Sequence, residues 1–323
     1  MSTLLEIKNL KVDLMSVRGI VHALSGVDLS IEEGEIHGLV GESGCGKSMT
    51  SRAVMRLLTP SRSRISGEVL FRGQDLLKLS EREMGKIRGD RISLIFQDPM
   101  TSLNPLMTVG DQIGEVFRLH EKSSKAEARE KTLAMLEKVG IYPPEKRIDQ
   151  YPHELSGGLQ QRVMIAMAIA NKPDLLIADE PTTALDVTIQ AQILELLKSL
   201  QKDTGMSILM ITHNFGVIAE VCDRVSVMYA GRIVESAGAR TIFHSAAHPY
   251  SKALIASIPK ADESSEYLAT IPGSPPELYN IQPGCPFAPR CFFASEECKA
   301  LPPMRSCGGD PGHIAACWHS QCR

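Results

Sequence analysis

Gly41-Glu-Ser-Gly-Cys-Gly-Lys-Ser48 decides the fold, because it matches G-x-x-x-x-G-K-[ST], the pattern of a phosphate-binding loop. The preceding run, Glu35-Ile-His-Gly-Leu-Val40, is short and largely apolar, as a buried strand would be. Apolar residues between Lys47 and Leu58 recur at a spacing that predicts a helix packed on a sheet. Strand, turn and helix N-terminus would then direct backbone N–H groups and a positive dipole end at one anion. The alternative is a chance glycine-rich turn.

The loop predicts a site for a nucleotide with magnesium. Lys47 would reach the β- and γ-phosphates, and the Ser48 hydroxyl would ligate Mg²⁺. The predicted nucleotide-binding residues of this region are Gly41, Glu42, Ser43, Gly44, Cys45, Gly46, Lys47, Ser48 and Met49. Cys45 stands beside Lys47 and a helix N-terminus, a setting that lowers the pKa of a thiol, so we expect a reactive side chain that ATP protects. The alternative is a side chain that points away and is inert.

Length and composition restrict the class of protein. The 323 residues suggest about two domains, and the net charge of −3 with a pI near 6.3 argues against general nucleic-acid binding. No run approaches the roughly 18 apolar residues of a membrane span, and the first residues lack the pattern of a signal peptide. We therefore expect a cytosolic chain whose membrane role, if it has one, comes through a partner.

Apolar periodicity predicts an α/β fold with alternating strands and helices around a mostly parallel, covered sheet. The first forty residues alternate as the strands of an antiparallel subdomain, and a helical insert occupies about residues 98–165. The predicted later strands are Ser66–Phe71, Arg91–Phe96, Pro173–Asp179, Ser207–Thr212 and Val225–Tyr229. The predicted helices include Ala126–Val139 and Thr188–Leu200. Residues 1–240 would form one domain, and the proline-rich residues 241–323 an irregular appendage that adds nothing to the sheet.

An acidic pair follows the apolar strand Leu175-Leu-Ile-Ala-Asp179. Opposite a phosphate loop, Asp179 would hold the magnesium shell, and Glu180 would be the general base for an attacking water. The alternative is an acidic strand end that caps the next turn.

A second phosphate-binding geometry is predicted at Leu155-Ser-Gly-Gly-Leu-Gln160, which opens a helix. Ser156 at the helix start, with Gly157 and Gly158 leaving backbone N–H groups accessible, suits an anion. Alone, this pattern is equally that of an ordinary N-cap. Gln97 and His213 each follow a predicted strand and are unremarkable by themselves. Together, and in this order along the chain, the three motifs and these two residues predict one nucleotide-hydrolysing site.

In that order the stretches resemble the ATP-binding cassette (ABC) family over residues 4 to about 240, which implies a P-loop NTPase core. The resemblance implies that Gln97 contacts Mg²⁺, that Leu155–Gln160 is the signature motif with Gln160 at the nucleotide site, and that Glu180 is catalytic. It also implies that Asp186 belongs to the D-loop and that His213 is the catalytic switch histidine. Leu14 departs from the family, because an aromatic ring often stacks on adenine there, and Asn214 stands where aspartate is usual.

The carboxyl-terminal part resembles the ATPases of dipeptide/oligopeptide importers. The matching stretches are Phe96–Pro105, Ala247–Leu254, Ile271–Pro276 and Gly284–Cys291. The resemblance implies a peripheral protein on the cytoplasmic face of the membrane, paired with a homologous ATPase or a second copy. Two permeases and an extracytoplasmic peptide-binding protein would complete the importer, with no role for nucleic acid. The cargo stays open among dipeptides, oligopeptides, nickel chelates and glutathione.

Two other functions compete with peptide import. The first is a soluble, non-transport cassette ATPase that acts on nucleic acid or ribosomes. Such proteins usually carry tandem cassettes or inserted coiled coils, whereas this chain has one cassette and no long heptad segment. The second is an ATPase whose cysteine-rich tail is only an interaction module.

One chain supplies one phosphate loop and one signature loop, and both must cover the same γ-phosphate. Ser156 lies in the helical insert, away from its own loop in the sequence. We therefore expect a head-to-tail dimer in which Lys47 of one subunit and Ser156 of the other hold ATP.

Six of the eight cysteines fall between Cys285 and Cys322. A tail with so few large apolar residues needs a cross-link or a metal to become ordered. Disulfides are disfavoured in a reducing cytosol, and zinc sites prefer closer C-x₂₋₄-C pairs. Four thiolates at long spacings suit a [4Fe–4S] cluster, and the importer resemblance implies the same. The expected ligands are Cys285, Cys291, Cys298 and Cys317, the last because the resemblance implies it: Cys317-Trp-His follows the family's pattern for the fourth position. Cys307 is the alternative to Cys317, and Cys322 is expected to be free.

Overall fold

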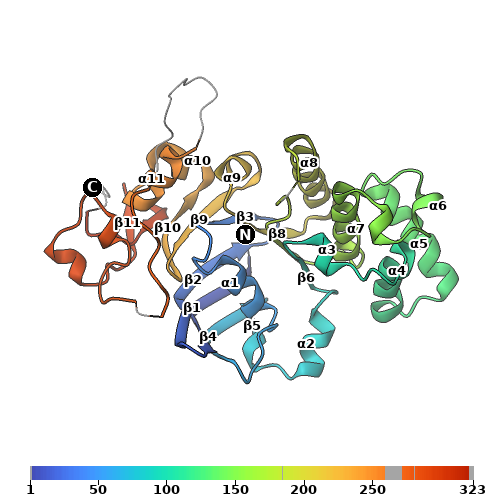
Figure 1. Cartoon of the computed structure of the whole chain (residues 1–323), viewed down its shortest axis with the longest axis horizontal. Coiled ribbons are helices and arrows are strands. Elements are labelled where there is room, and N and C mark those ends of the chain that lie inside the picture. The colour runs from blue at the N-terminus through green and yellow to red at the C-terminus, as the bar shows by residue number, and fades with distance from the viewer. Residues whose placement is uncertain (1, 184, 259–270, 280, 320–323) are drawn as a thin grey trace. The chain divides into compact units, whose positions relative to one another are not determined.

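The structure is a computed structural model that describes residues 2–183, 185–258, 271–279 and 281–319 (Figure 1). The chain divides into two units. Unit 1 comprises the chain up to Leu77 together with the chain from Met210 onward, and unit 2 comprises Lys78–Leu209. The boundary falls inside strand β8 (Ser207–Thr212), all of whose residues are buried. Within the described residues, no helix is both long and apolar enough to cross a bilayer.

An antiparallel sheet in unit 1 has the order β2-β1-β4-β5. Its strands are β1 (Thr3–Ser16), β2 (Gly19–Glu32), β4 (Ser63–Phe71) and β5 (Gln74–Asp75). Leu5, Leu10 and Val12 of β1 are fully buried, while Glu6, Lys8 and Lys11 are exposed or partly exposed. This alternation follows the pleat of a strand with one covered face. The predicted antiparallel subdomain is therefore confirmed.

The second sheet of unit 1 carries the phosphate loop. Its order within this unit is β11-β12-β10-β9-β3, with β3 parallel to β9 and the other pairs antiparallel. The strands are β3 (Ile36–Val40), β9 (Arg224–Tyr229), β10 (Arg232–Gly238), β11 (Arg305–Cys307) and β12 (Asp310–Ala315). The helices are α1 (Lys47–Val54), α9 (Phe215–Val221), α10 (Ala239–Ser245) and α11 (Pro249–Ala256). Two 3₁₀ turns, η3 (Ala288–Arg290) and η4 (Glu296–Lys299), precede β11.

The expectation that the extension adds nothing to the sheet is wrong. Strand β12 pairs with β10, with Glu235 opposite Ala315. The fully buried Glu235 carboxylate accepts hydrogen bonds from the backbone N–H groups of Ala247 (2.6 Å) and His248 (3.0 Å). His313 Nε2 lies 2.8 Å from the same carboxylate. A buried carboxylate needs such partners, so Glu235 binds two parts of the extension to the sheet. Sequence reading missed this because β11 and β12 are short and proline-flanked.

Unit 2 contains two parallel strands and most of the helices. Strand β6 (Ile92–Ile95) pairs with β7 (Leu175–Asp179). The helices are α2 (Glu81–Ile87), α3 (Pro99–Ser102), α4 (Val109–His120), α5 (Lys125–Lys138), α6 (Pro144–Arg147), α7 (Gly157–Ile169) and α8 (Val187–Thr204). The 3₁₀ turns are η1 (Leu76–Lys78), at the unit boundary, and η2 (Pro152–Glu154).

Local signals explain the boundaries of the unit 2 helices. Helix α5 begins at a capping box in which Ser124 and Glu127 exchange hydrogen bonds, and it ends before Gly140, whose φ is +73°. Helix α8 has Asp186 as its N-cap and Gly205, with φ of +71°, as its C-cap. The predicted helix Ala126–Val139 is confirmed to within one residue at each end, and the predicted helix Thr188–Leu200 is confirmed but continues four residues further, to Thr204. The predicted insert, about residues 98–165, contains α3 to α6 and most of α7, which ends at Ile169.

Candidate functional site

Two glycines let the phosphate loop lie against neighbouring backbone. A Cβ atom on Gly41 would lie 2.2 Å from the Met228 carbonyl oxygen at the end of β9. A Cβ on Gly46 would lie 2.8 Å from the carbonyl oxygen of Ala23, and Gly46 has φ of +112° as the N-cap of α1. Real Cβ atoms do not approach so closely, so both positions require glycine. Gly44 differs, because a Cβ there would meet nothing within 4 Å, although its φ is +80°.

Lys47 begins α1 and is only 5% exposed. Its Nζ donates to the carbonyl oxygens of Gly41 (2.8 Å) and Glu42 (3.1 Å). The ammonium group is therefore held against the loop that would surround the phosphates. Ser48 follows in the first turn of the same helix, and its carbonyl accepts a hydrogen bond of 2.9 Å from Ser51 Oγ.

The surroundings of Cys45 argue against the expected reactivity of its thiol. Its side chain is 6% exposed, and a Cβ on Gly41 would lie 2.8 Å from its Sγ atom. Burial raises the pKa of the Cys45 thiol, and the neighbouring Lys47, 4.0 Å away, offsets that effect only in part. The inert alternative is the one that the structure supports, because desolvation of a thiolate exceeds the attraction of the ammonium group.

Glu42 is held by side chains that sequence analysis did not identify. Its backbone N–H donates to the Tyr250 hydroxyl (3.0 Å), and its carboxylate receives both terminal nitrogens of Arg290, at 2.7 and 3.0 Å. Tyr250 comes from α11 and Arg290 from η3. Both belong to stretches noted for their importer resemblance, but no local pattern connects either residue to the loop.

In unit 2, Asp179 and Glu180 lie where β7 ends. Asp179 is 6% exposed. Glu180 has φ of +50°, an uncommon conformation for glutamate. Its Oε2 atom accepts hydrogen bonds from Gln97 Nε2 and from the Thr183 hydroxyl, both 2.9 Å long. The structure thus brings together the predicted base and Gln97, which are 83 residues apart in sequence.

The predicted signature loop forms the start of α7. Ser156 is the N-cap and is exposed together with Gly157, while Gly158 is partly exposed. A Cβ on Gly158 would lie 2.8 Å from the Ile189 side chain, so this glycine serves packing. Gln160 is buried, and its amide donates to the carbonyls of Pro152 (2.8 Å) and Leu155 (3.2 Å). The Gln160 side chain therefore stabilises the backbone that precedes the helix.

The remaining predicted site residues divide between the units. Asp186, in unit 2, accepts a hydrogen bond from the N–H of Ile189 (2.9 Å) as the cap of α8. His213, in unit 1, is exposed directly after β8. Leu14, on β1, is partly exposed and pairs with Val21.

Four free cysteines occupy the extension: Cys285, Cys291, Cys298 and Cys317. Burial raises the pKa of Cys285, as to a lesser degree do the neighbouring Cys298 and Cys317. Burial and then Cys298 likewise raise the pKa of Cys291. Cys307 is disulfide-bonded, so it is not the alternative ligand; Cys322 lies outside the described residues.

Backbone N–H groups donate to two of these sulfur atoms. Phe293 donates to Cys291 Sγ (3.4 Å), and His319 donates to Cys317 Sγ (3.3 Å). Such donors stabilise thiolate ligands of iron–sulfur clusters. Yet across the described residues, no group of three or more His, Cys, Asp or Glu side chains is arranged to hold a metal ion. The four free thiols have the donor chemistry of metal ligands, but the described residues do not bring them together as a metal-holding group.

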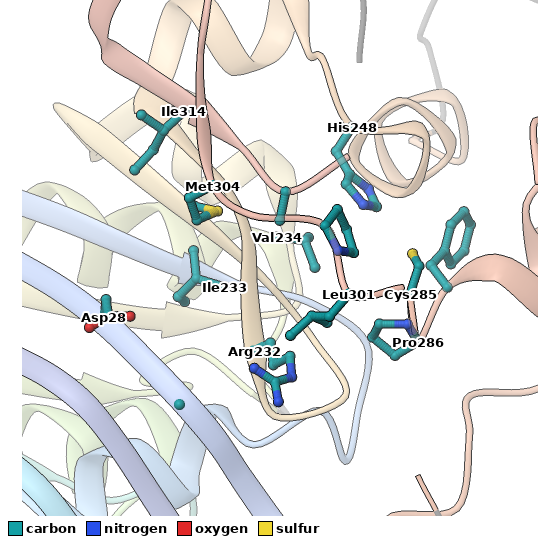
Figure 2. Close-up of a pocket in the computed structure, with 14 residues that line it drawn as sticks. Asp28, Arg232, Ile233, Val234, His248, Cys285, Pro286, Leu301, Met304 and Ile314 are labelled. Atoms are coloured by element: carbon teal, nitrogen blue, oxygen red, sulfur yellow. The ribbon is translucent and has the colours of Figure 1, made fainter. Parts of the chain in front are cut away.

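A cavity of about 440 Å³ is lined by residues of β2, β10 and the extension (Figure 2). Asp28 and Arg232 contribute charge on the sheet side, and Cys285, Pro286 and Leu301 line it from the extension. Burial lowers the pKa of Arg232, but without a bound group the cavity indicates no particular ligand.

Comparisons with known proteins cover both the loop and the extension. A family model described as ABC transporter matches residues 24–183. A second model, described as the C-terminal region of oligopeptide/dipeptide transporters, matches residues 234–298.

Two curated relatives match nearly the whole chain. The dipeptide transport ATP-binding protein DppD of Bacillus subtilis is 50% identical over 98% of this chain and 95% of its own length. The oligopeptide transport ATP-binding protein OppD of Escherichia coli is 50% identical over 98% of this chain and 93% of its own length. Among solved structures, a dimeric post-hydrolysis state of the ATP-binding cassette MJ0796 bound to ADP and Pi has a TM-score of 0.66 and 32% identity. It covers 73% of this chain and 99% of that chain.

Proposed function

The chain belongs to the ATP-binding subunits of the ABC transporter family, and on that premise we propose that it hydrolyses ATP to drive the import of peptides. The observation that carries the proposal is the 50% identity to dipeptide and oligopeptide transport proteins over 98% of the chain. That match includes the phosphate loop and the extension, so the alternative of a non-transport cassette has no comparable support.

We assign each part of hydrolysis to residues that the sequence predicts for it. The loop and Lys47 bind the phosphates, and Glu180 accepts the proton of the water that attacks the γ-phosphorus, so that ADP and phosphate leave. Mg²⁺ would neutralise phosphate charge, and Ser48, Gln97 and Asp179 are the residues that would hold it. Gln97 and Thr183 fix the Glu180 carboxylate with two hydrogen bonds.

The functional state is a head-to-tail dimer with a homologous subunit or a second copy. Lys47 and Ser156 stand on different units of the chain, and the exposed start of α7 is available to a partner's nucleotide. The similarity to a dimeric cassette that holds ADP and Pi supports this arrangement. Asp186 and His213 complete the proposed interface at the nucleotide.

Peptide import requires partners that this chain lacks. We place the ATPase on the cytoplasmic face of the membrane, where two permeases bind it and an extracytoplasmic peptide-binding protein delivers the cargo. Nucleic acid has no role in this scheme.

The extension is proposed to bind a [4Fe–4S] cluster through Cys285, Cys291, Cys298 and Cys317. Four free thiols with mutual electrostatic effects and backbone N–H donors support it. We assign the cluster a structural role, because ATP hydrolysis needs no redox chemistry. In that role it would order the extension.

Reconstitution tests the function. Membrane vesicles that contain the chain, a homologous ATPase, its permeases and a binding protein should take up a labelled peptide only with internal ATP. Lys47→Ala should abolish uptake while the complex still assembles. Hydrolysis without copurification of any polytopic permease would contradict the transport role.

A further inference from the structure

An ion pair connects the cysteine-rich extension to the phosphate loop. Arg290 Nη1 lies 2.7 Å from Glu42 Oε2, and Nη2 lies 3.0 Å from Oε1, so the contact is bidentate. The two residues are 248 positions apart in sequence. The Arg290 side chain is 5% exposed and that of Glu42 is 25% exposed. A bidentate pair with so little solvent has a defined geometry, unlike most ion pairs on a surface.

Arg290 has no donor left for another ligand. Its Nε donates to the Pro272 carbonyl (2.8 Å), Nη1 also donates to the Tyr229 hydroxyl (3.3 Å), and Nη2 also donates to the Ile271 carbonyl (3.4 Å). With the two contacts to Glu42, all five N–H groups of the guanidinium are used. Arg290 therefore holds Glu42 in place and does not itself bind a phosphate.

Glu42 is fixed at three points beside the expected phosphates. Arg290 holds the carboxylate, Tyr250 accepts from the backbone N–H, and the backbone carbonyl accepts from Lys47. Without a cation, a carboxylate on an anion-binding loop would repel the phosphates.

We propose that Arg290 is a positioning residue for the nucleotide loop, and that by neutralising Glu42 it makes ATP affinity depend on the docked extension. The inference rests on the proposed ATPase function.

The position of Arg290 explains the dependence on docking. It lies between Cys285 and Cys291, and the Cys285 N–H donates to the Cys298 carbonyl (2.8 Å). Phe287, in the same turn, packs on Tyr250 with ring centroids 5.3 Å apart. A change that undocks this segment removes the partner of Glu42 as well.

The test measures equilibrium binding of MgATP to the full-length chain. Arg290→Gln should raise the Kd about three- to tenfold, with a larger rise at low salt, because an unpaired carboxylate then faces the phosphates. Adding Glu42→Gln should return the Kd to within about twofold of wild type, since two amides replace two charges. Arg129→Gln, which breaks the bidentate pair with Asp149 on the surface of unit 2, is the matched control and should leave the Kd unchanged.

The rescue separates positioning from loss of structure. A Kd for Arg290→Gln equal to that of wild type overturns the inference while the proposed ATPase function stands. A weakened Kd that Glu42→Gln does not relieve also overturns it, because removal of the carboxylate cannot repair an undocked extension. Should Arg290→Gln not fold, Arg290→Lys takes its place. Lysine keeps the charge but cannot make the bidentate contact, so the Kd for MgATP should rise about twofold. An unchanged Kd would overturn the inference. Absence of MgATP binding by the wild-type chain overturns both proposals.

Discussion

Gln97 donates a hydrogen bond of 2.9 Å to the Glu180 carboxylate, and Thr183 donates another of the same length. Two donors on one oxygen stabilise the ionised carboxylate, the form that a general base needs. The backbone of Glu180 adopts φ of +50°, which costs free energy in a residue with a side chain. Strain of this kind concentrates at functional sites, where the surrounding structure maintains it. The geometry therefore favours Glu180 as the catalytic base over a simple cap of the strand end.

Glu180→Gln should reduce ATP hydrolysis about 10²- to 10⁴-fold while MgATP still binds. The amide keeps the shape of the side chain but cannot accept the proton, so ATP should accumulate in a dimer. Turnover assays and size-exclusion chromatography with light scattering, with and without MgATP, measure both effects. Glu195→Gln on the exposed face of α8 is the control and should retain turnover. Failure of Glu180→Gln to form an ATP-dependent dimer would contradict the head-to-tail arrangement.

Gly41→Ala should abolish MgATP binding, because its Cβ would meet the Met228 carbonyl oxygen at 2.2 Å and displace the start of the loop. Gly44→Ala is the matched comparison, since it has positive φ but open space around its Cβ. It should cost only the strain of that conformation, about 1–2 kcal/mol of stability, and retain binding. Titration with MgATP and denaturant unfolding of both variants check this. Equal losses of binding would show that backbone strain, and not the close approach to β9, requires these glycines.

Cys45 should react slowly with iodoacetamide in the folded protein. Burial raises the pKa of its thiol, which lowers the fraction of reactive thiolate at neutral pH, and the sulfur packs against Gly41. We expect alkylation at least about tenfold slower than in the unfolded chain, as measured by peptide mapping over time. Rapid modification of Cys45 that ATP prevents would restore the opposite expectation, that the helix N-terminus activates the thiol.

The sequence predicts the features that depend on local patterns, and it does not predict those that depend on burial or on contacts between distant residues. The loop, the strand before Asp179 and the start of α7 are local patterns, and each forms where the pattern predicts. Thiol reactivity depends on burial, which for Cys45 is set by Gly41 and the adjoining turn. Likewise, β12 pairs with β10 across more than seventy residues of sequence, as Glu235 and Ala315 illustrate. Arg290 and Glu42 are farther apart still, so no periodicity could have joined them.

His248 should make the protein less stable in mild acid. Burial lowers its pKa from 6.5 to about 4, against a smaller opposing effect of a hydrogen bond with the Ala316 backbone. Its Nδ1 accepts a hydrogen bond from the Tyr250 backbone N–H. The backbone N–H of His248 donates to the Glu235 carboxylate, which His313 also contacts. The unfolded chain binds a proton below about pH 6.5 that the folded chain excludes until about pH 4. Stability is thus fully present above that range and falls by about 2 kcal/mol from this group at pH 5.

His248→Asn isolates this contribution, because asparagine can still accept the Tyr250 N–H as the cap of α11. Denaturant unfolding at pH 7.5 and pH 5 should show a gain of about 2 kcal/mol for the variant over wild type on acidification. His244→Asn, at an exposed position on α10, controls for the removal of a histidine. A wild-type pH profile in His248→Asn would contradict the assignment.

Protein purified anaerobically should be brown and contain about four irons per chain. The four free thiols provide the thiolates, and the N–H donors at Cys291 and Cys317 match sulfur that carries negative charge. Cys291→Ser combined with Cys298→Ser should remove the colour and the iron. Cys222→Ala, which removes a free cysteine at the end of α9, should keep both.

Since Arg290 adjoins Cys291, cluster loss should also weaken MgATP binding, which gives a second readout that does not depend on colour. Colourless protein with one zinc, or colour that survives the double substitution, would refute the ligand assignment.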